Sequence, residues 1–298
     1  MTTPVRFSYH SADGTELVGY RWAPEGVERA AGVVVLAHGM GEHIRRYDHV
    51  ADAFTKRGFA VYGHDHRGHG SSISPDDRPG ELGPGGWRAL VDDLNLVVGL
   101  AKSEYPGAKL ALVAHSMGSF AAQQFLLDHA ADLDAVALTG TAALDLLEPG
   151  MDLSGDVDLS AFNAPFRPAR TDYDWLSRDT AVVDAYLADP LCGFGIDAES
   201  AREMFAGARR VAEAAELATI PKDLPVYVAG GSKDPVNADL ALLHALADRY
   251  RMAGLTDVTV RVYDDARHEI LNETNRGEVI EDLLEWLTRV TAHPGAGA

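Results

Sequence analysis

Residues 112–119 read Leu-Val-Ala-His-Ser-Met-Gly-Ser, and this stretch decides the fold prediction. Its apolar first half is typical of the end of a buried strand, and residues 117–129 continue with a helical pattern. Ser116 therefore lies on a sharp strand-to-helix elbow, where a strained backbone holds a side chain outward. The elbow requires small residues two positions before and after the serine, and here they are Ala114 and Gly118. The alternative is a serine that only caps a helix.

A nucleophilic serine needs a base, and the base needs an acid that orients it. Asp234 follows the short apolar run 225–231, which ends in two glycines and has the pattern of a buried parallel strand. His268 follows the alternating, β-branched run 258–263. Because the carboxyl ends of parallel strands meet at one edge of a sheet, we expect the acid, the base and Ser116 to meet there.

Other candidates for the base and the acid have weaker contexts. Of the histidines that follow the predicted acid, only His268 comes after a strand, because His244 falls inside a predicted helix and His293 lies in a Pro-Gly-Ala tail. Two further carboxylates, Asp264 and Asp265, lie near His268 in the sequence, but either would have to compete with Asp234, which lies in the loop where the acid is expected.

A glycine-rich turn, His38-Gly-Met-Gly-Glu-His43, follows the apolar strand 32–37. Glycines at such a turn allow a backbone amide to point at a developing negative oxygen. We expect the donors to be the N–H groups of Met40 and Met117, the second being the residue after the nucleophile. Taken alone, the turn equally fits a simple strand end. We expect His38 to hold this loop by hydrogen bonds and not to react.

Composition restricts the function classes. The 298 residues include 45 acidic and 26 basic side chains, a net charge of −19, which argues against nucleic acid or anionic membranes as partners. No apolar run approaches the length of a membrane span, and no secretory signal is visible at residues 1–10. The single cysteine, Cys192, cannot form an internal disulfide, so we expect a cytoplasmic protein. The sequence predicts neither a cofactor nor a metal, because the histidines of 65–70 fit a structural loop.

The order of elements predicts an α/β fold with a doubly wound, mostly parallel sheet and an inserted helical cap. We expect the core at 1–141 and 217–298, and the cap at 142–216, where the alternation of strands and helices breaks. The predicted strands are 5–10, 15–22, 33–36, 59–62, 109–114, 135–138, 225–231 and 258–263, the first two forming a hairpin. The predicted helices are 47–57, 87–105, 117–129, 180–188, 198–217 and 238–252.

The predicted cap supplies the candidate residues of a substrate pocket, each of which fits the interior of the cap equally well. They are Phe162, Phe166, Tyr173, Trp175, Leu176 and Phe205. The beginning of the cap is acidic and has no basic residue, with carboxylates at Asp145, Glu148, Asp152, Asp156 and Asp158. Because anionic lipid repels such a segment, we expect no stable membrane association and action on dispersed substrate.

The chain resembles the monoacylglycerol lipase and lysophospholipase branch of the α/β-hydrolase superfamily, which includes the serine aminopeptidase-like hydrolases. The motifs that carry the resemblance span nearly the whole chain: 38–43 with Arg46-Tyr47, 65–72, 114–118, 231–236 and 267–273, with lid-like segments at 176–179 and 185–191. The resemblance implies the same nucleophile, acid, base and oxyanion amides. Two positions depart from it: Ala114 replaces the common glycine, and Thr180 replaces a proline in the lid.

We therefore expect a cofactor-free serine hydrolase that cleaves carboxylic esters, either monoacylglycerol-like or short acyl or aryl esters, through an acyl-enzyme. The partner is a small-molecule ester, and the sequence leaves the oligomeric state open. The alternatives on the same triad are an aminopeptidase, a thioesterase, a lactonase and an acyltransferase. An aminopeptidase would use cap carboxylates such as Asp152 and Asp156 to bind a free amine. A ligand-binding signalling protein of the same fold is the alternative that is not an enzyme.

Overall fold

The computed structural model describes residues 2–26 and 29–292, so His293 lies outside the described residues. One eight-stranded sheet forms the centre, with the strand order β1-β2-β4-β3-β5-β6-β7-β8. The first three strands of this order pair antiparallel, and all later neighbours pair parallel. The strands are β1 Val5–His10, β2 Glu16–Trp22, β3 Gly32–Ala37, β4 Phe59–His64, β5 Leu110–His115, β6 Ala135–Thr139, β7 Val226–Gly231 and β8 Val258–Tyr263.

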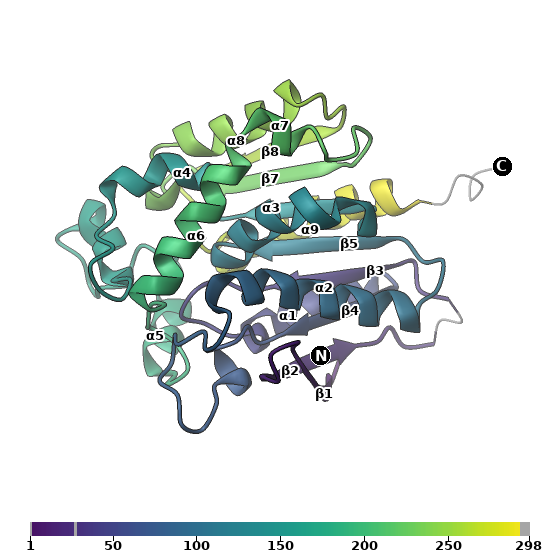
Figure 1. Cartoon of the computed structure of the whole chain (residues 1–298), viewed down its shortest axis with the longest axis horizontal. Helices are drawn as coiled ribbons and strands as arrows, with labels where there is room; N and C mark the ends of the chain where they lie inside the picture. The colour runs from purple at the N-terminus through teal and green to yellow at the C-terminus, as the bar shows by residue number, and fades with distance from the viewer. Residues whose placement is uncertain (1, 27–28, 293–298) are drawn as a thin grey trace.

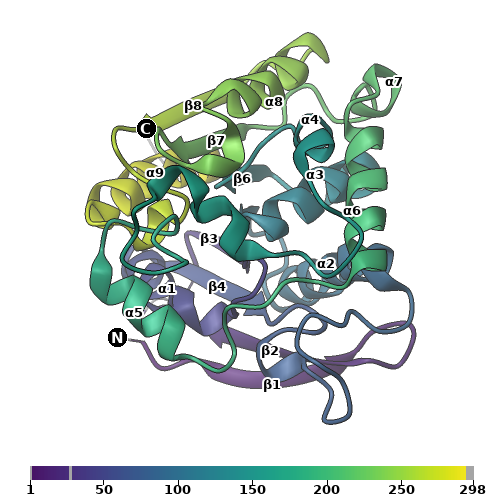
Figure 2. The same ribbon diagram turned by 90° about the vertical axis from the view of Figure 1, so that its left-hand side faces the viewer.

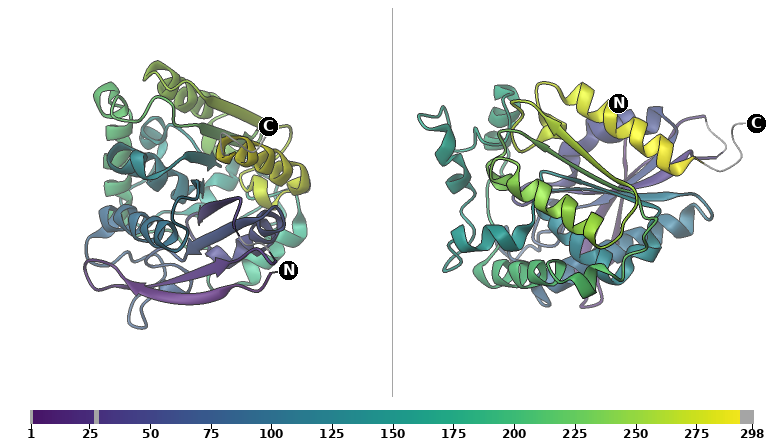
Figure 3. Two further views of the ribbon diagram at one scale, coloured as in Figure 1. Left: turned by 90° about the vertical axis from the view of Figure 1, so that its right-hand side faces the viewer. Right: turned by 90° about the horizontal axis from the view of Figure 1, so that it is seen from above.

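Helices cover both faces of this sheet (Figures 1 and 3). The α-helices are α1 Asp48–Lys56, α2 Gly86–Glu104, α3 Met117–His129, α4 Leu144–Leu147, α5 Thr180–Ala188, α6 Ala198–Val211, α7 Ala214–Leu217, α8 Ala241–Met252 and α9 Arg276–Thr291. Helices α1 and α9 pack on one face, and α2, α3 and α8 pack on the other. The central strands β3, β4 and β5 are buried along their whole length. They read as unbroken apolar runs because both of their faces are covered.

Residues 140–225 contain no strand and include α4 to α7. Figure 2 looks onto the end of the sheet that this segment covers, with α5 and α6 on opposite sides. Backbone hydrogen bonds connect this segment to the core. The Trp175 carbonyl accepts the His268 N–H at 3.3 Å, and the Leu176 carbonyl accepts the Glu269 N–H at 2.8 Å. This helical insertion therefore lies next to the loop that follows β8.

The predicted α/β class is confirmed, and most predicted elements lie within two residues of those in the structure. Two helices differ. The helix predicted from residue 238 starts at Ala241, because Ala238, Asp239 and Leu240 have positive φ and the Asn237 side chain accepts the Leu240 N–H at 2.8 Å.

The helix predicted over 198–217 is broken in two. Glu213 has an extended backbone (φ −81°, ψ 120°), which separates the end of α6 from the start of the short helix α7. Sequence analysis also missed α9, although its buried residues recur on one helical face. Thr180, the departure in the lid, is the first residue of α5, and Asp179 caps that helix by accepting the Ala181 N–H at 3.1 Å.

The elbow between β5 and α3 allows no side chain at Gly118. A Cβ atom there would lie 2.5 Å from the His38 carbonyl oxygen and 2.7 Å from the Ala37 carbonyl oxygen. These are backbone atoms at the end of β3, which cannot move aside as a flexible side chain can.

We predict that Gly118→Ala destabilises the protein by about 1–3 kcal/mol, the usual cost of overpacking a tight site. Gly99 is the matched control, because it lies inside α2 and a Cβ there meets nothing within 4 Å. Gly99→Ala should raise the free energy of unfolding by about 0.5–1 kcal/mol, because alanine loses less backbone entropy in a helix. Denaturant unfolding measures both, and equal stabilities for the two variants would contradict this account.

Candidate active site

Ser116 occupies a strained turn between β5 and α3. Its φ of 51° and ψ of −121° lie outside the regions that residues with a side chain normally adopt, at a cost of about 1–3 kcal/mol. Hydrogen bonds hold it there: its N–H donates to the Thr139 carbonyl at 2.9 Å, and its own carbonyl accepts from the N–H groups of Ser119 and Phe120. The neighbouring strand and the first turn of α3 therefore fix the direction of the serine side chain.

The structure brings Ser116, His268 and Asp234 into one hydrogen-bonded row. The Ser116 hydroxyl lies 2.8 Å from His268 Nε2, and His268 Nδ1 lies 3.0 Å from each carboxylate oxygen of Asp234. Asp234 Oδ1 also accepts the Val236 N–H at 2.9 Å, which fixes the carboxylate in its loop. A carboxylate can only accept, so Nδ1 carries the proton and Nε2 is left to accept the serine proton. Asp264 and Asp265 are exposed and make no contact of this kind.

His268 lies in an environment that favours its charged form. Burial opposes the positive charge, but the neighbouring Asp234 carboxylate, with help from Glu269, outweighs burial and raises the pKa of His268 above 6.5. The opposite holds for His115, whose ring centroid lies 4.9 Å from that of His268. Burial and the repulsion from His268 lower the pKa of His115 to about 3, so it stays neutral beside the row.

The loop after β3 carries the predicted oxyanion donor Met40. Within residues 2–26 and 29–292, neither the Met40 N–H nor the Met117 N–H has a hydrogen-bond partner. Met40 and Ser116 line the same two cavities. His38 Nδ1 donates to the Gly39 carbonyl at 2.8 Å, and this carbonyl belongs to the same rigid peptide unit as the Met40 N–H. His38 thus fixes the direction in which the Met40 amide points.

A chain of neutral histidines supports this loop from behind. His38 Nε2 accepts the His66 N–H at 2.9 Å, His64 Nε2 lies 3.1 Å from His66 Nδ1, and the Tyr9 hydroxyl lies 2.8 Å from His64 Nδ1. Burial lowers the pKa of the three histidines His38, His64 and His66, that of His64 to about 4. Sequence analysis expected a structural loop at 65–70, and the separate contacts of these histidines are ones that the sequence does not show.

Arg46 is a positioning residue that sequence analysis did not single out. It lies between Glu42 and Glu269, at 2.6 Å from Glu42 Oε2 and 2.7 Å from Glu269 Oε2. The other oxygen of Glu42 accepts the Gly39 N–H at 2.6 Å, and Glu269 is the neighbour of His268. All three charged groups are nearly buried. One guanidinium therefore joins the oxyanion loop to the loop of the predicted base.

Two cavities meet at Ser116. The larger is apolar, and Phe162, Trp175 and Phe205 are among its lining residues. The smaller one has a more polar lining, which includes Glu42, Tyr186 and Glu269, together with Trp175 and Leu176.

Four of the six predicted pocket residues therefore line one of these two cavities, and Phe166 and Tyr173 line neither. Phe166 stacks on the Arg267 guanidinium, whose carbon lies 4.5 Å from the ring centroid. Tyr173 donates to the Gly193 carbonyl at 2.9 Å. Phe166 therefore packs against the loop after β8, and Tyr173 makes its contact within the insertion.

The comparison with known families agrees with this geometry. Residues 28–275 match the family described as serine aminopeptidase, S33. The chain belongs to this family. The expected α/β-hydrolase relationship is thereby confirmed.

Similar proteins share nearly the whole length of this hydrolase. It is 32% identical over 293 residues to a monoacylglycerol lipase of Mycolicibacterium smegmatis, covering 96% of this chain and 98% of the relative. It is 28% identical to a monoglyceride lipase of Mus musculus, over 96% of this chain and 91% of the relative. A carboxyl esterase from Bacillus coagulans superimposes with a TM-score of 0.85 at 25% identity, covering 98% of this chain and 100% of that one. These relatives confirm an ester hydrolase of the α/β-hydrolase fold.

No helix among the described residues is long and apolar enough to cross a membrane.

We predict that Arg46→Met lowers the free energy of unfolding by about 3–5 kcal/mol, because it leaves two buried carboxylates without their cation. It should also lower kcat more than it raises KM, because the loops on both sides of Ser116 lose their common anchor. Arg46→Lys should recover part of the lost stability and part of the lost kcat, since lysine restores the charge without the paired hydrogen bonds.

The matched control is Arg88→Met, which removes an exposed pair with Asp92. It should leave both measurements nearly unchanged. If Arg46→Met behaved like Arg88→Met in denaturant unfolding and steady-state kinetics, Arg46 would not have the positioning role described above.

Proposed function

We propose that this hydrolase cleaves esters of one acyl chain and a small polar alcohol, as in a monoacylglycerol, through an acyl-enzyme on Ser116. The observation that carries the proposal is the row Ser116–His268–Asp234 at the junction of an apolar and a more polar cavity. The apolar cavity suits an acyl chain, and the cavity with Glu42 and Glu269 suits the hydroxyl groups of a leaving alcohol.

The geometry supports the following sequence of steps. His268 Nε2 takes the Ser116 proton as the hydroxyl oxygen attacks the ester carbonyl. The Met40 and Met117 amides stabilise the negative oxygen of the tetrahedral intermediate. As the intermediate collapses, His268 returns the proton to the leaving alcohol, and the Asp234 carboxylate holds the imidazole in the correct tautomer. A water molecule then repeats the cycle on the acyl-enzyme and releases the acid.

The acyl cavity is nearly closed in this structure. Its volume of about 40 Å³ is far below the several hundred Å³ of typical ligand pockets. Four methionines are among its lining residues: Met40, Met117, Met151 and Met204. Because methionine side chains are unbranched and adaptable, we propose that they move aside for the acyl chain and accept more than one chain length. We also keep the division into a core and a cap at 142–216 as a proposal, with the cap as the lid of this cavity.

The aminopeptidase alternative has less support. It requires carboxylates near the nucleophile to bind a free amine, and Asp152 and Asp156 were the candidates. Asp152 caps its own turn by accepting the Ser154 N–H at 2.9 Å. Asp156 forms an ion pair with Arg78, with 3.5 Å between its Oδ2 and the arginine Nη1. Neither lines a cavity at Ser116.

We predict that the protein hydrolyses p-nitrophenyl esters of several chain lengths and leaves aminoacyl-anilides intact. Ser116→Ala should lower kcat for the esters by roughly 10⁴- to 10⁶-fold, since the members of a triad act as a unit. Asp264→Ala is the control for the acid and should keep nearly full activity. Cleavage of anilides without esters would overturn the proposed substrate class, and a large loss in Asp264→Ala would overturn the assignment of Asp234.

The pH dependence follows from the environment of His268. Only its neutral imidazole can accept the serine proton, so activity is lost as the pH falls through the pKa of His268 in the folded protein. Because the Asp234 carboxylate raises this pKa, we predict that the midpoint of the acid limb of kcat/KM lies above pH 6.5. A pH profile with a p-nitrophenyl ester measures it, and a midpoint below 6.5 would contradict the prediction.

We further propose that the protein acts in the cytoplasm on dispersed substrate, without stable membrane association. The acidic start of the cap is a weaker argument for this than the sequence suggests. Asp145 forms an ion pair with Arg249, and Glu148 forms one with Arg209, so part of the negative charge is compensated. A different observation supports the proposal. The insertion has two exposed large hydrophobic side chains, Leu146 and Leu187, and their helices α4 and α5 lie on opposite sides of it (Figure 2). They form no common apolar face.

We predict that the rate of hydrolysis of a monoacylglycerol shows no jump as its concentration passes the critical micelle concentration. In the same preparation, the protein should stay in the supernatant when anionic liposomes are sedimented. A steep rise of the rate above that concentration, or co-sedimentation, would show that the protein docks on lipid.

A further inference from the structure

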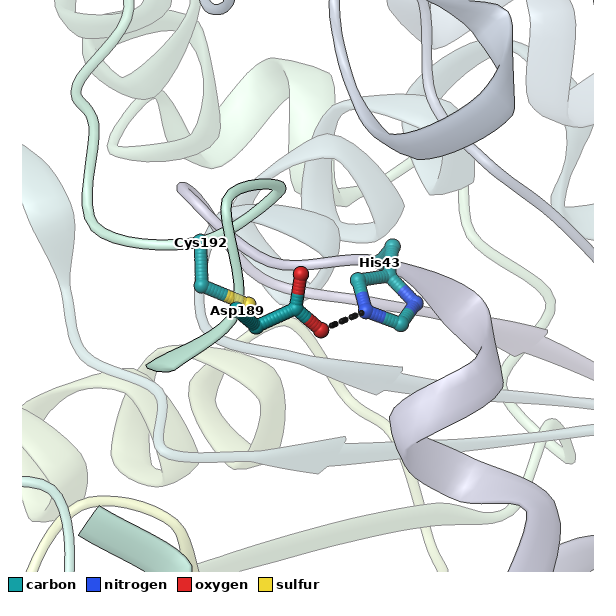
Figure 4. A group of neighbouring side chains, drawn as sticks. All are labelled: His43, Asp189 and Cys192. Atoms are coloured by element: carbon teal, nitrogen blue, oxygen red, sulfur yellow. Dashed lines mark hydrogen bonds and ion pairs between the residues drawn. The ribbon is translucent and has the colours of Figure 1, made fainter. Parts of the chain in front are cut away.

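Three potential metal ligands meet where the insertion touches the loop after β3. His43 belongs to that loop, and Asp189 and Cys192 belong to the turn that follows α5. One ligand atom of each lies within 4.8 Å of the other two, and His43 Nε2 lies 3.0 Å from Asp189 Oδ2. In Figure 4 the carboxylate of Asp189 lies between the thiol of Cys192 and the imidazole of His43. His43 is 146 positions from Asp189 in the sequence, so no local motif brings it together with the other two ligands, and sequence analysis predicted no metal.

We propose that His43, Asp189 and Cys192 form a binding site for a divalent transition metal ion of the zinc type. Imidazole nitrogen, carboxylate oxygen and thiolate sulfur are the three donor types that Zn²⁺ takes in proteins. With bonds of about 2.0–2.3 Å, the donors of a tetrahedral site lie roughly 3.3–3.7 Å apart. The nitrogen and oxygen are already close to this spacing, and the sulfur needs to approach by about 1 Å at most, which a side-chain rotation supplies. A water molecule completes the fourth position.

The protons balance in a simple way. In the metal-free protein, His43 donates through Nε2 to the Asp189 carboxylate. A metal ion that binds Nε2 replaces this hydrogen bond, and the proton of the ring is then carried by Nδ1. The Cys192 thiol loses its proton when it binds the ion. One proton is therefore released to solvent for each ion bound.

The surroundings permit a bound cation. All three residues are partly exposed, so an ion reaches the site from solvent. Burial raises the pKa of the Cys192 thiol, the Arg46 guanidinium lowers it, and the carboxylates of Glu42, Asp189 and Glu269 raise it. An arriving ion must therefore displace a firmly held thiol proton, but it enters surroundings with three carboxylates and one guanidinium. Arg46 is held between Glu42 and Glu269, so most of its charge is already compensated. The local balance of charge therefore favours the ion.

Such a site would tie the insertion to the oxyanion loop. The turn that carries Cys192 already contacts this loop, because the Gly193 N–H donates to the Gly41 carbonyl at 2.9 Å. Gly41 follows Met40, whose amide is a proposed oxyanion donor. A bound ion would add a second link between the same two segments, and it would stabilise the folded protein because the unfolded chain holds these ligands far apart.

Titration of the 298-residue protein with Co²⁺ tests the proposal directly, because a thiolate bound to Co²⁺ gives an intense charge-transfer absorption in the near ultraviolet. Cys192 is the only cysteine in the chain, so the band has one possible source. We expect a band that saturates at one Co²⁺ per chain and disappears when Zn²⁺ is added. His43→Gln and Asp189→Asn should weaken Co²⁺ binding at least tenfold.

Thermal unfolding provides an independent readout. Zn²⁺ should raise the Tm of the native protein and leave that of Cys192→Ala unchanged. His244→Ala removes an exposed histidine of α8 and serves as the control, which should keep both the band and the Tm shift. Absence of the band, or a band of equal affinity in His43→Gln and Asp189→Asn, would overturn the proposal, the latter because it would indicate a thiol that binds metal by itself.

Discussion

The close approach of α3 to the end of β3 is the constraint on which the rest of the site depends. Gly118 lies so near the carbonyls of Ala37 and His38 that no side chain fits between them. This contact sets the start of α3 directly against the loop that carries Met40. As a result, the Ser116 hydroxyl and the two proposed oxyanion amides share one small space. The strained backbone of Ser116 is the energetic consequence, and the hydrogen bonds of β6 and α3 stabilise it.

Buried polar groups position the loops around this space. A loop cannot be held by a sheet ladder, so its peptide groups need other partners. His38 holds the Gly39 carbonyl, and Glu42 holds the Gly39 N–H, which fixes the peptide units on both sides of this residue. Arg46 then links Glu42 to the loop of His268. The histidines can do this at neutral pH because burial keeps them uncharged, whereas the carboxylates need a buried arginine between them.

The insertion over the site is more closely tied to the core than its position at the edge suggests. Its backbone accepts hydrogen bonds from His268 and Glu269, and the Trp175 ring lies 4.8 Å from that of His268. The apolar cavity beneath it is correspondingly small. Methionines supply part of its wall, so movement of their side chains could admit an acyl chain while the backbone hydrogen bonds to His268 and Glu269 stay intact.

Local patterns in the sequence determined the sheet, the elbow at Ser116 and the strand-end positions of Asp234 and His268. Each of these depends on residues within one strand and the turn that follows, so periodicity and turn chemistry suffice to find them. Only the tertiary structure shows that Arg46 links two loops, and that Phe162 lines the apolar cavity while Phe166 packs on an arginine. It alone also brings His43 close to Cys192. These features join segments more than a hundred residues apart, or depend on the path of an irregular insertion. Such contacts follow from packing, which no local pattern of apolar and polar residues records.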